Sequence, residues 1–445
     1  MLIVRGADLM DGTPIYDIKP YIPYADCHPD ASAGFTAQTR SHHLNMVCGD
    51  ALWAKVPADQ QAALQGVLEN DPRPSYQHDP ERVYGMEFGG LEVHFKVDGE
   101  TLTVTGSYPL QYAQQFTIDE CEGGYYLITI DGTRYLVVPE GENAPAELDA
   151  DITVLQQPIE SIYLVSSSAM DPIISIDGLD TVALSGTQAD NWYLDAAKTA
   201  MENGQIAYAG KYSAPDYETI LAANCGLAIE NTMIYHTPEV KEQLEKFGVP
   251  VLVERSSYES GPLARMEWVK LYGVLLGKTD EAEQVFDDAV QRIAPLENES
   301  ATGKTVAFFS ITSNNLATVR KGGDYVAKMI EMAGGDYVFS DLTDSGNNLA
   351  TVNISLEDFY AGAKDADVLI YNSTIEGEIR TMDELIAKCP LLAQFKAVQQ
   401  GNVWCTAQSL FQQSMEMPDL ILDMNKVFAE GTPDDSELKF LTKIT

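Results

Sequence analysis

The chain has 445 residues, 45% of them hydrophobic, which is enough for two to four domains with apolar cores. Its 67 acidic residues outnumber its 28 basic residues and give a formal charge of −39. Such a charge repels phosphate backbones and argues against tight, non-specific nucleic-acid binding by the whole chain. The six cysteines form no Cys-x-x-Cys pair, which argues against a short-spaced cysteine metal site.

Residues 1–105 are expected to form a small α+β domain. A helical pattern covers residues 59–69, and strand patterns at 83–88 and 91–97 flank the turn Gly89-Gly90. The same stretch contains two longer motifs. They are Asp-Gly-Thr-Pro-x-x-Asp-Ile-Lys-Pro-Tyr, which begins at residue 11, and Asp-Pro-Arg-Pro-x-Tyr, which begins at residue 71.

This pair of motifs resembles the TsaA-like tRNA methyltransferases, which use S-adenosylmethionine to methylate threonylcarbamoyl-adenosine in tRNA. The resemblance covers residues 2–104 and only the C-terminal part of that family, so we expect the β-barrel that builds most of the cofactor pocket to be missing. We therefore expect neither catalysis nor a cofactor, and tRNA is not an expected partner. Five residues match the family's motif positions, either as RNA or active-site contacts or as residues that hold a turn and a loop: Asp11, Asp17, Lys19, Arg73 and Tyr76.

Residues 106–150 are expected to form a β-hairpin and a connector. Two β-rich runs, Tyr125–Ile130 and Arg134–Pro139, flank Asp131-Gly132, a pair typical of a tight hairpin turn. The acidic stretch from residue 141 to residue 150 has few large apolar side chains, so it is expected to be the connector.

From residue 151 onward, buried-strand patterns alternate with amphipathic helices, which predicts mostly parallel sheets with helices on both faces. The first α/β lobe is expected at 151–261, the second at 300–431, and a tail at 432–445. Between the lobes, residues 262–299 carry apolar side chains at helical spacing, interrupted at Gly277, which predicts one helix followed at once by a second. The predicted fold class is therefore α/β, with two doubly wound lobes joined by a long helix and preceded by a small α+β N-terminal domain.

The common catalytic motifs are absent from the sequence. It contains no Gly-x-Ser-x-Gly, no Walker-type loop, no His-Glu-x-x-His and no Gly-x-Gly-x-x-Gly. Five of the six histidines precede residue 95, so the lobes have a single histidine, His236, which is expected to serve helix entry. Two lobes and a helical bridge then favour ligand binding between the lobes over catalysis.

The lobes resemble the helical-hinge substrate-binding proteins of ABC importers for ferric siderophores, haem and cobalamin, over residues 110–430. Individually weak segments carry this resemblance in the right order: Asp216–Leu221 before Leu227–Glu230, Leu244–Val251, Leu276–Glu283, Ile354–Asp358 before Asp365–Ile370, and Phe395–Trp404. The resemblance implies an anionic or oxygen-rich metal chelate, such as an iron–siderophore, between the lobes. It also implies the importer's membrane subunits as partners, and we expect the chain to be a monomer.

The resemblance places the ligand among loops at the carboxyl ends of the strands. Ten residues there could contact it, the aromatic ones by stacking and the basic ones by holding negative charge, or else could be local partners of the many acids. They are Lys211, Tyr212, Glu230, Arg255, Tyr258, Arg265, Arg320, Lys321, Asn372 and Phe411. Glu218 and Glu357 match the family positions that dock on the importer, although either could be an ordinary solvated acid.

Three other interpretations remain open. The chain could be a tRNA-modifying fusion protein that methylates adenosine with S-adenosylmethionine, or a gene-model fusion of two neighbours. A two-lobed metal-cluster or chelatase-like enzyme would need convergent Cys and His ligands, and the lobes offer few. The sequence as written contains neither a secretion signal nor an 18-residue apolar run, which predicts a cytoplasmic location, whereas the resemblance implies a lipid-anchored or periplasmic protein.

Overall fold

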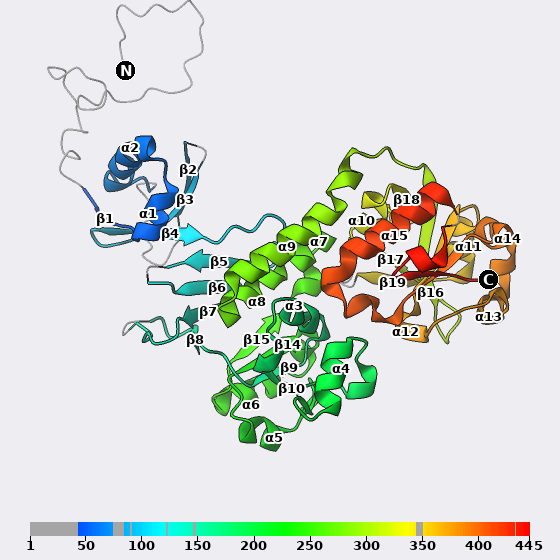
Figure 1. The fold of residues 1–445 in the computed structure, drawn as a ribbon, viewed down its shortest axis with the longest axis horizontal. Helices are drawn as coiled ribbons and strands as arrows, with labels where there is room; N and C mark the ends of the chain where they lie inside the picture. Colours follow the sequence, from blue (N-terminus) through cyan, green and yellow to red (C-terminus); the bar gives the residue numbers. More distant parts are fainter. Residues whose placement is uncertain are drawn as a thin grey trace, which may run out of the picture. The chain divides into compact units, whose positions relative to one another are not determined.

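The computed structural model describes residues 43–73, 84–89, 91–121, 123–145, 148–343, 350–431 and 433–445. The chain divides into two compact units, Met1–Gly106 and Ser107–Thr445, and each is described by itself (Figure 1). Among the described residues, no helix combines the length and the apolar character that crossing a membrane requires.

The first unit packs two helices on a small sheet. Strands β2, β3 and β4 form an antiparallel meander, and β1 pairs with β4 in parallel. The core contains Leu64 and Leu68 of the second helix and Phe95 of β3. The elements are β1 (Asn45–Val47), α1 (Asp50–Lys55), α2 (Ala58–Glu69), β2 (Tyr84–Phe88), β3 (Leu91–Asp98) and β4 (Thr101–Ser107).

The predicted helix and the two hairpin strands of this unit are confirmed to within one residue at each end. Gly89 shows why the turn needs glycine. Its φ is +58°, and a Cβ atom there would lie 2.3 Å from Oε1 of Gln60 in α2. Strands β1 and β4 were not expected from the sequence.

The second unit begins with a four-stranded sheet. The predicted hairpin around Asp131-Gly132 is confirmed as β6 and β7, and both turn residues have positive φ, at +48° and +79°. Ile152–Gln156, which was expected to open the first lobe, instead pairs with β7 in parallel. The strands are β5 (Phe116–Glu120), β6 (Tyr126–Ile130), β7 (Thr133–Val138) and β8 (Ile152–Gln156).

The first lobe is a parallel five-stranded sheet in the order β11-β10-β9-β14-β15. Alternate residues of β14 face opposite layers, because Leu227 and Ile229 join one core cluster and Ala228 joins another. The elements are β9 (Ile162–Leu164), α3 (Met170–Ser175), β10 (Val182–Ser185), α4 (Asp195–Glu202), β11 (Ala207–Tyr208), α5 (Tyr217–Ala222), β14 (Leu227–Asn231), α6 (Pro238–Lys246) and β15 (Val251–Glu254).

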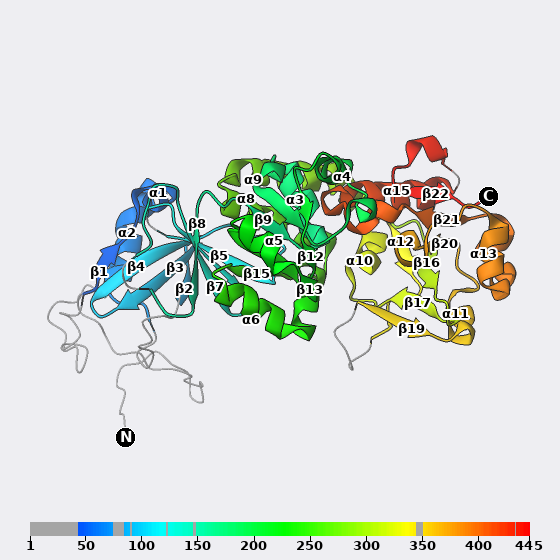
Figure 2. The same cartoon turned by 90° about the horizontal axis from the view of Figure 1, so that it is seen from below.

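The bridge is divided at Gly277, as the interrupted apolar pattern predicts, and its helices form a hairpin instead of one continuous long helix. Helix α7 (Pro262–Met266) is followed by α8 (Trp268–Leu276). Helix α8 ends at Gly277, which caps it in the left-handed conformation at φ +68°. Helix α9 (Thr279–Ile293) then packs beside α8 (Figures 1 and 2). The two helices approach each other so closely at Gly273 that a Cβ atom there would lie 2.5 Å from Cβ of Ala282.

The second lobe has a mixed sheet instead of the expected mostly parallel one. Strands β16, β18, β20 and β21 are parallel, whereas β17, β19 and β22 introduce antiparallel pairs. The segment expected to be a tail contains strand β22 of this sheet, and its residues Leu441 and Ile444 are buried. The strands are β16 (Lys304–Ile311), β17 (Ala317–Arg320), β18 (Gly335–Tyr337), β19 (Thr351–Ile354), β20 (Val368–Tyr371), β21 (Val403–Thr406) and β22 (Leu441–Lys443).

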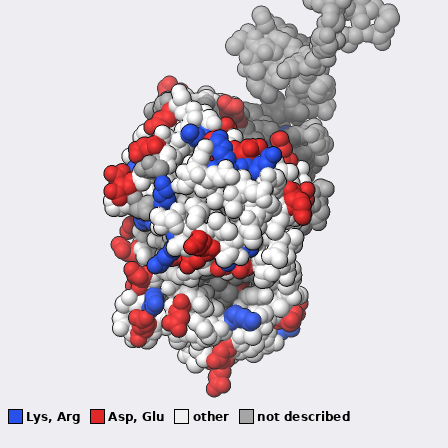
Figure 3. All heavy atoms as spheres, turned by 90° about the vertical axis from the view of Figure 1, so that its right-hand side faces the viewer, with Lys and Arg blue, Asp and Glu red and all other residues white. Residues whose placement is uncertain are grey.

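Helices cover the sheet of the second lobe: α10 (Tyr325–Met332), α11 (Leu356–Ala363), α12 (Ser373–Glu376), α13 (Met382–Lys388), α14 (Lys396–Gln400) and α15 (Met417–Glu430). The end of this lobe that Figure 3 presents carries small groups of Lys and Arg and of Asp and Glu with uncharged surface between them. The excess of acid in the chain therefore does not make this face uniformly negative.

Candidate functional site

The loops that follow the strands of one lobe contact the loops that follow the strands of the other. Gln412, beyond β21, accepts a hydrogen bond from the amide of Tyr193 at 2.8 Å and donates one to the carbonyl of Asn191 at 2.8 Å. Both lobe 1 residues follow β10. Since carboxyl ends of parallel strands share one edge of a sheet, this contact places the two strand-end surfaces against each other.

A second contact between the lobes is buried. Oγ of Ser414 donates to the carbonyl of Ser168 at 3.2 Å, and the amide of Met415 donates to a carboxylate oxygen of Asp171 at 2.7 Å. Burial raises the pKa of Asp171 to about 6, against the lowering effect of the Met415 hydrogen bond. Gln412 and Asp171 were not singled out in the sequence. In the sequence, the one feature that could have indicated these two residues was their position after predicted strands.

Two arginines meet at one tyrosine beside this contact. The guanidinium carbon of Arg265, in α7, lies 4.1 Å from the ring centroid of Tyr325, and that of Arg320 lies 5.7 Å from the same centroid. Arg320 also lies 4.9 Å from the ring centroid of Phe411, which precedes Gln412. The structure therefore brings together three of the predicted ligand residues, from the bridge, from the end of β17 and from the turn after β21.

The charge of this arginine pair is only partly compensated. Arg320 has an acidic neighbour, Asp324, at 3.7 Å, whose pKa burial raises although the Arg320 charge lowers it. The side chain of Arg265 makes no hydrogen bond or ion pair with any residue that the structure describes, and its Nε is buried, although its charge also lowers the pKa of Asp324. Two guanidinium groups and one carboxyl group leave a positive site in a strongly negative chain, and such a site suits an anion.

Exposed apolar side chains gather at the same strand ends. Eleven large hydrophobic residues are exposed among the described parts of the chain, and six of them either end a strand or lie in the segment after one. Exposed apolar groups concentrated in one kind of place indicate a binding surface. The six are Tyr193, Tyr208, Met233, Tyr235, Tyr258 and Ile375.

Arg255, a predicted anion ligand, is already paired. Its guanidinium lies 2.5 Å from a carboxylate oxygen of Asp131 in the β6–β7 turn. It also donates to the hydroxyl of Tyr235 at 3.4 Å and lies 4.7 Å from the ring centroid of Tyr258. Its charge is therefore compensated, unlike that of Arg265.

Glu230, another predicted ligand residue, is completely buried, and neither carboxylate oxygen has a hydrogen-bond partner. It lies on the same face of β14 as Ala228, which packs with Ile220 and Leu244. Burial raises the pKa of Glu230 to about 8, so at neutral pH it is mostly uncharged. In this structure Glu230 is therefore part of the core and does not reach a ligand.

The remaining predicted ligand residues divide between surface and structural positions. Lys211 is exposed, and Tyr212 is half-buried against the outer core cluster of lobe 1. The amide of Lys321 donates to the carbonyl of Ala350 at 3.0 Å. Asn372 caps α12, because its Oδ1 accepts from the amide of Thr374 at 3.2 Å.

The two predicted docking residues occupy equivalent positions. Glu218 and Glu357 are exposed in the first turns of α5 and α11, and each helix follows a capping side chain, Asp216 and Ser355 respectively. Neither glutamate forms an ion pair with a described residue. Their matched placement, one in each lobe, is compatible with docking and stays a prediction.

In the first unit, Arg73 is held locally. Its Nε and NH2 donate to the two carboxylate oxygens of Asp71 at 2.8 and 2.9 Å, so the pair is bidentate. Asp71 has a φ of +53°, typical of a tight turn. This geometry favours a loop-holding role for Arg73. Asp11, Asp17, Lys19 and Tyr76 lie outside the described residues.

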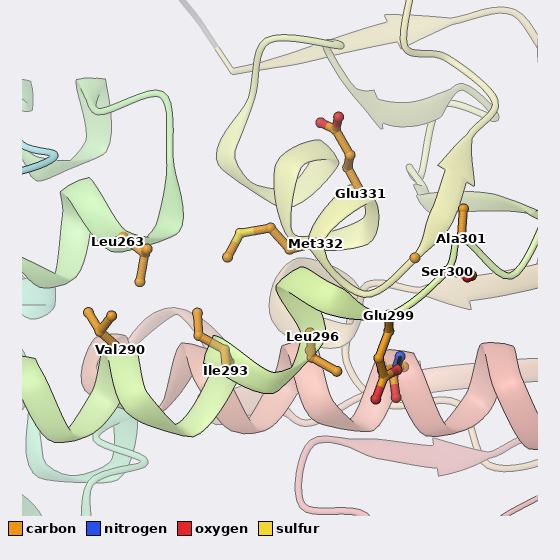
Figure 4. Close-up of a pocket in the computed structure, with 11 residues that line it drawn as sticks. Leu263, Val290, Ile293, Leu296, Glu299, Ser300, Ala301, Glu331 and Met332 are labelled. Atoms are coloured by element: carbon orange, nitrogen blue, oxygen red, sulfur yellow. Dashed lines mark hydrogen bonds between the residues drawn. The ribbon is translucent and has the colours of Figure 1, made fainter.

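A hollow of about 270 Å³ lies away from the strand carboxyl ends, where the bridge enters lobe 2. Figure 4 shows Leu263, Val290 and Ile293 pointing into it, with Met332 opposite. Ala301, just before β16, also lines it, which places it at the amino ends of the lobe 2 strands. No group of three or more described His, Cys, Asp or Glu residues is arranged to hold a metal ion.

Two lobes with mainly parallel strands, a helical bridge and a partly buried positive site between strand-end loops define a two-lobed ligand-binding protein. Residues 171–409 match the family described as periplasmic binding protein, and because this is more than half of the chain, the chain belongs to that family. Residues 44–109 match the TrmO C-terminal domain, and residues 1–27 match the tRNA-methyltransferase O N-terminal domain.

Relatives match either part of the chain. An uncharacterized lipoprotein of Methanocaldococcus jannaschii is 25% identical over 313 residues, which is 67% of this chain and 73% of the relative. A tRNA (adenine(37)-N6)-methyltransferase of Eikenella corrodens is 40% identical over 94 residues, which is 21% of this chain and 53% of the relative. The chain thus spans about half the length of that methyltransferase.

The fold is shared with solved structures. A periplasmic binding protein from Veillonella parvula superimposes with a TM-score of 0.51 and 16% identity, over 70% of this chain and 99% of that one. The resemblances drawn from the sequence, to the two-lobed binding proteins and to the tRNA methyltransferases, are confirmed by these matches. The expectation that only the C-terminal part of the methyltransferase family is represented is wrong, because residues 1–27 match its N-terminal domain.

Proposed function

We propose that the chain is the substrate-binding component of an ABC importer and holds an anionic metal chelate, an iron–siderophore or a related compound, between its lobes. The arginine pair at Tyr325 carries this proposal. It provides positive charge that Asp324 compensates only in part, beside the contact between the lobes, where a ligand would touch the bridge and lobe 2 together. The reaction is binding alone, so the lobes need no cofactor of their own.

Removing either arginine is expected to weaken binding of an anionic ferric chelate. Each charge-assisted contact contributes about 1.5–3 kcal/mol, so Arg265→Ala or Arg320→Met should raise the Kd roughly 10- to 100-fold. Arg265→Ala leaves no described hydrogen-bonding group without its partner, because the Arg265 side chain makes no hydrogen bond with a described residue. In Arg320→Met, the methionine side chain keeps the apolar packing at position 320. Isothermal titration calorimetry with a ferric tris(catecholate) is the measurement.

Arg380→Ala is the matched control, since the Arg380 side chain is 80% exposed and pairs with Glu378. Its Kd should stay at the wild-type value. A wild-type Kd in both Arg265→Ala and Arg320→Met, with folded protein by circular dichroism, would remove the arginine pair from the site.

Docking on the importer is the second part of the proposal. Because Glu218 and Glu357 are exposed and unpaired by described residues, Glu218→Ala and Glu357→Ala should each weaken docking about tenfold or more. The readout is chelate-stimulated ATP hydrolysis by the importer in vesicles. Chelate affinity should not change, because neither side chain belongs to the strand-end loops.

Glu202→Ala serves as the control for docking, since Glu202 is an exposed helix acid of lobe 1. Normal stimulation by both docking variants would contradict the assignment, as would a large loss of chelate affinity in either.

The alternative, a tRNA-modifying fusion protein, is favoured by the matches of residues 1–27 and 44–109. Against it stands Arg73, the motif residue that the structure describes, whose guanidinium is occupied by Asp71. The observations therefore favour the binding function, which uses the larger unit.

A further inference from the structure

The hollow where the bridge enters lobe 2 is larger than the gaps of a close-packed interior. Its volume is about 270 Å³, whereas protein cores contain few voids larger than a water molecule. Side chains from three helices face this space: Leu263 of α7, Val290 and Ile293 of α9, and Met332 of α10 (Figure 4). The open space therefore lies between the helices of the bridge and a helix of lobe 2.

The lining of the hollow has an apolar part and an exposed polar part. The four apolar side chains are buried or half-buried, and Ile293 is only 4% exposed. By contrast, Glu299, Ser300 and Glu331 are exposed, so the hollow meets water on its polar side. An apolar wall beside a wet rim suits an amphiphile, whose aliphatic chain leaves water while its polar head stays hydrated.

The charge of the lining indicates the kind of head group. Glu299 and Glu331 are the charged residues among the eleven that line the hollow, and neither forms an ion pair with a described residue. In Figure 4 the carboxylate of Glu331 points away from the apolar side chains, so Glu299 is the acid that a head group would meet. Glu299 accepts a hydrogen bond from Nδ2 of Asn425 at 3.1 Å, and this neutral partner leaves its charge uncompensated. A carboxylate at the rim attracts a cation and repels an anion.

We propose that this hollow is a second ligand site, for a small amphiphile with an aliphatic chain and a cationic head, such as a primary alkylammonium ion. The chain packs among the four apolar side chains, and the ammonium group donates to the carboxylate of Glu299. At about 30 Å³ for each water-sized group, the space admits a chain of roughly six to eight carbon atoms. The site is separate from the strand-end loops that would hold the chelate, because Ala301 places it at the amino ends of the lobe 2 strands.

Calorimetry on the full chain tests the site with octylammonium, octanol and octanoate, which share one aliphatic chain and differ in the charge of the head. We expect saturable binding of octylammonium with a Kd in the millimolar range or below. Octanoate should bind roughly fivefold more weakly or worse, because its head has the same charge as Glu299. Methylammonium, which has the head without the chain, should show no measurable binding.

Variants locate the binding in the hollow. Val290→Phe places a larger side chain there and should weaken octylammonium binding roughly tenfold, and Met332→Trp should do the same from α10. Val154→Phe is the matched control, because Val154 is 36% exposed on β8 and is not among the lining residues. Glu299→Gln keeps the shape of the side chain without its charge, so it should reduce the preference for octylammonium over octanol roughly two- to fivefold.

Unchanged octylammonium affinity in both Val290→Phe and Met332→Trp, with both proteins folded by circular dichroism, would overturn the site. An equal loss in Val154→Phe would also overturn it, since the cation would then adsorb across the acidic surface. Equal affinity for octylammonium and octanoate, or an unchanged preference in Glu299→Gln, would contradict the cationic head. Because these probes contain no metal chelate, their failure would leave the proposed function standing, and failure of chelate binding would leave this site standing.

Discussion

Replacing Glu267 by alanine is expected to destabilise the second unit more than any other single change considered for it. Glu267 is fully buried between α7 and α8 and accepts hydrogen bonds from the amides of Gln111, Tyr112 and Ala113 at 2.7–2.8 Å. Lys270, 3% exposed, donates to the same carboxylate at 2.9 Å. The glutamate thus ties the segment before β5 to the bridge.

Glu267→Ala would leave three amides without their acceptor and would leave the buried ammonium group of Lys270 with the carbonyl of Pro109 but no counter-charge. Breaking one side of a buried pair costs about 3–5 kcal/mol, and the free energy of unfolding of this unit should fall by that amount. Urea denaturation followed by circular dichroism measures the change. Hydrogen exchange gives a local readout, since the amides of residues 111–113 should lose protection first.

Glu281→Ala is the matched control, because Glu281 is exposed in the first turn of α9, and surface changes of this kind stay within about 0.5 kcal/mol. Adding Lys270→Met to Glu267→Ala should recover part of the loss by removing the unpaired ammonium group. Wild-type stability and protection in Glu267→Ala would contradict the tethering role.

The second large effect is expected at Glu230, and it depends on pH. Its pKa is about 8 in the folded chain, whereas an ordinary glutamate has 4.5. A group whose folded pKa is raised favours folding below the unfolded pKa, and this contribution is lost as the pH rises through the folded pKa. Between pH 4.5 and pH 8 the penalty for ionising Glu230 in the core therefore grows, to roughly 4–5 kcal/mol.

Glu230→Gln removes this titration. At pH 9 the variant should be more stable than wild type by up to roughly 4 kcal/mol, and at pH 5 the two should differ little beyond the change of side chain. The measurement is the urea midpoint at both pH values. Glu202→Gln, at an exposed acid, should follow wild type at both. Parallel curves for Glu230→Gln and wild type would show that Glu230 is not buried as an acid.

Local elements were predictable where the pattern is local. The hairpin at Asp131-Gly132 follows from two β-rich runs and a turn pair, and the helix at Ala58–Glu69 follows from apolar spacing. The bridge was predicted as one helix followed by a second after Gly277, but the reversal of chain direction between them depends on Gly277 in the left-handed conformation and on the close approach of Gly273 to Ala282. That contact joins two different helices, so the apolar periodicity of either helix in the sequence does not reveal it.

The candidate site shows the same limit. Arg265 and Arg320 could be chosen as basic residues near predicted strand and helix ends, but their convergence on Tyr325 requires the fold. The pairing of Arg255 with Asp131 joins residues 124 positions apart, so the sequence could not reveal that its charge is compensated. Glu230 was chosen for its place at a strand end, and the direction of its side chain depends on which face of β14 is covered.

Met233 and Tyr235 lay within reach of sequence reasoning. Met233 and Tyr235 follow an expected strand by a few residues, and large apolar groups in such loops have no core to join, whereas Tyr193 lies where an amphipathic helix was expected. The partner of Gln412 on the other lobe was not within reach, because its two hydrogen bonds cross more than 200 positions of chain.

The most direct test of the binding function is a fluorescence titration of the wild-type chain with ferric tris(catecholate), ferric citrate, haem and cobalamin. Trp192 is the reporter, since it lies between Asn191 and Tyr193, the residues that Gln412 contacts. We predict saturable one-to-one binding of an anionic metal chelate with a change in tryptophan emission that Trp192→Phe removes. Saturation by none of the four, or tight binding of only a neutral ligand, would contradict the account.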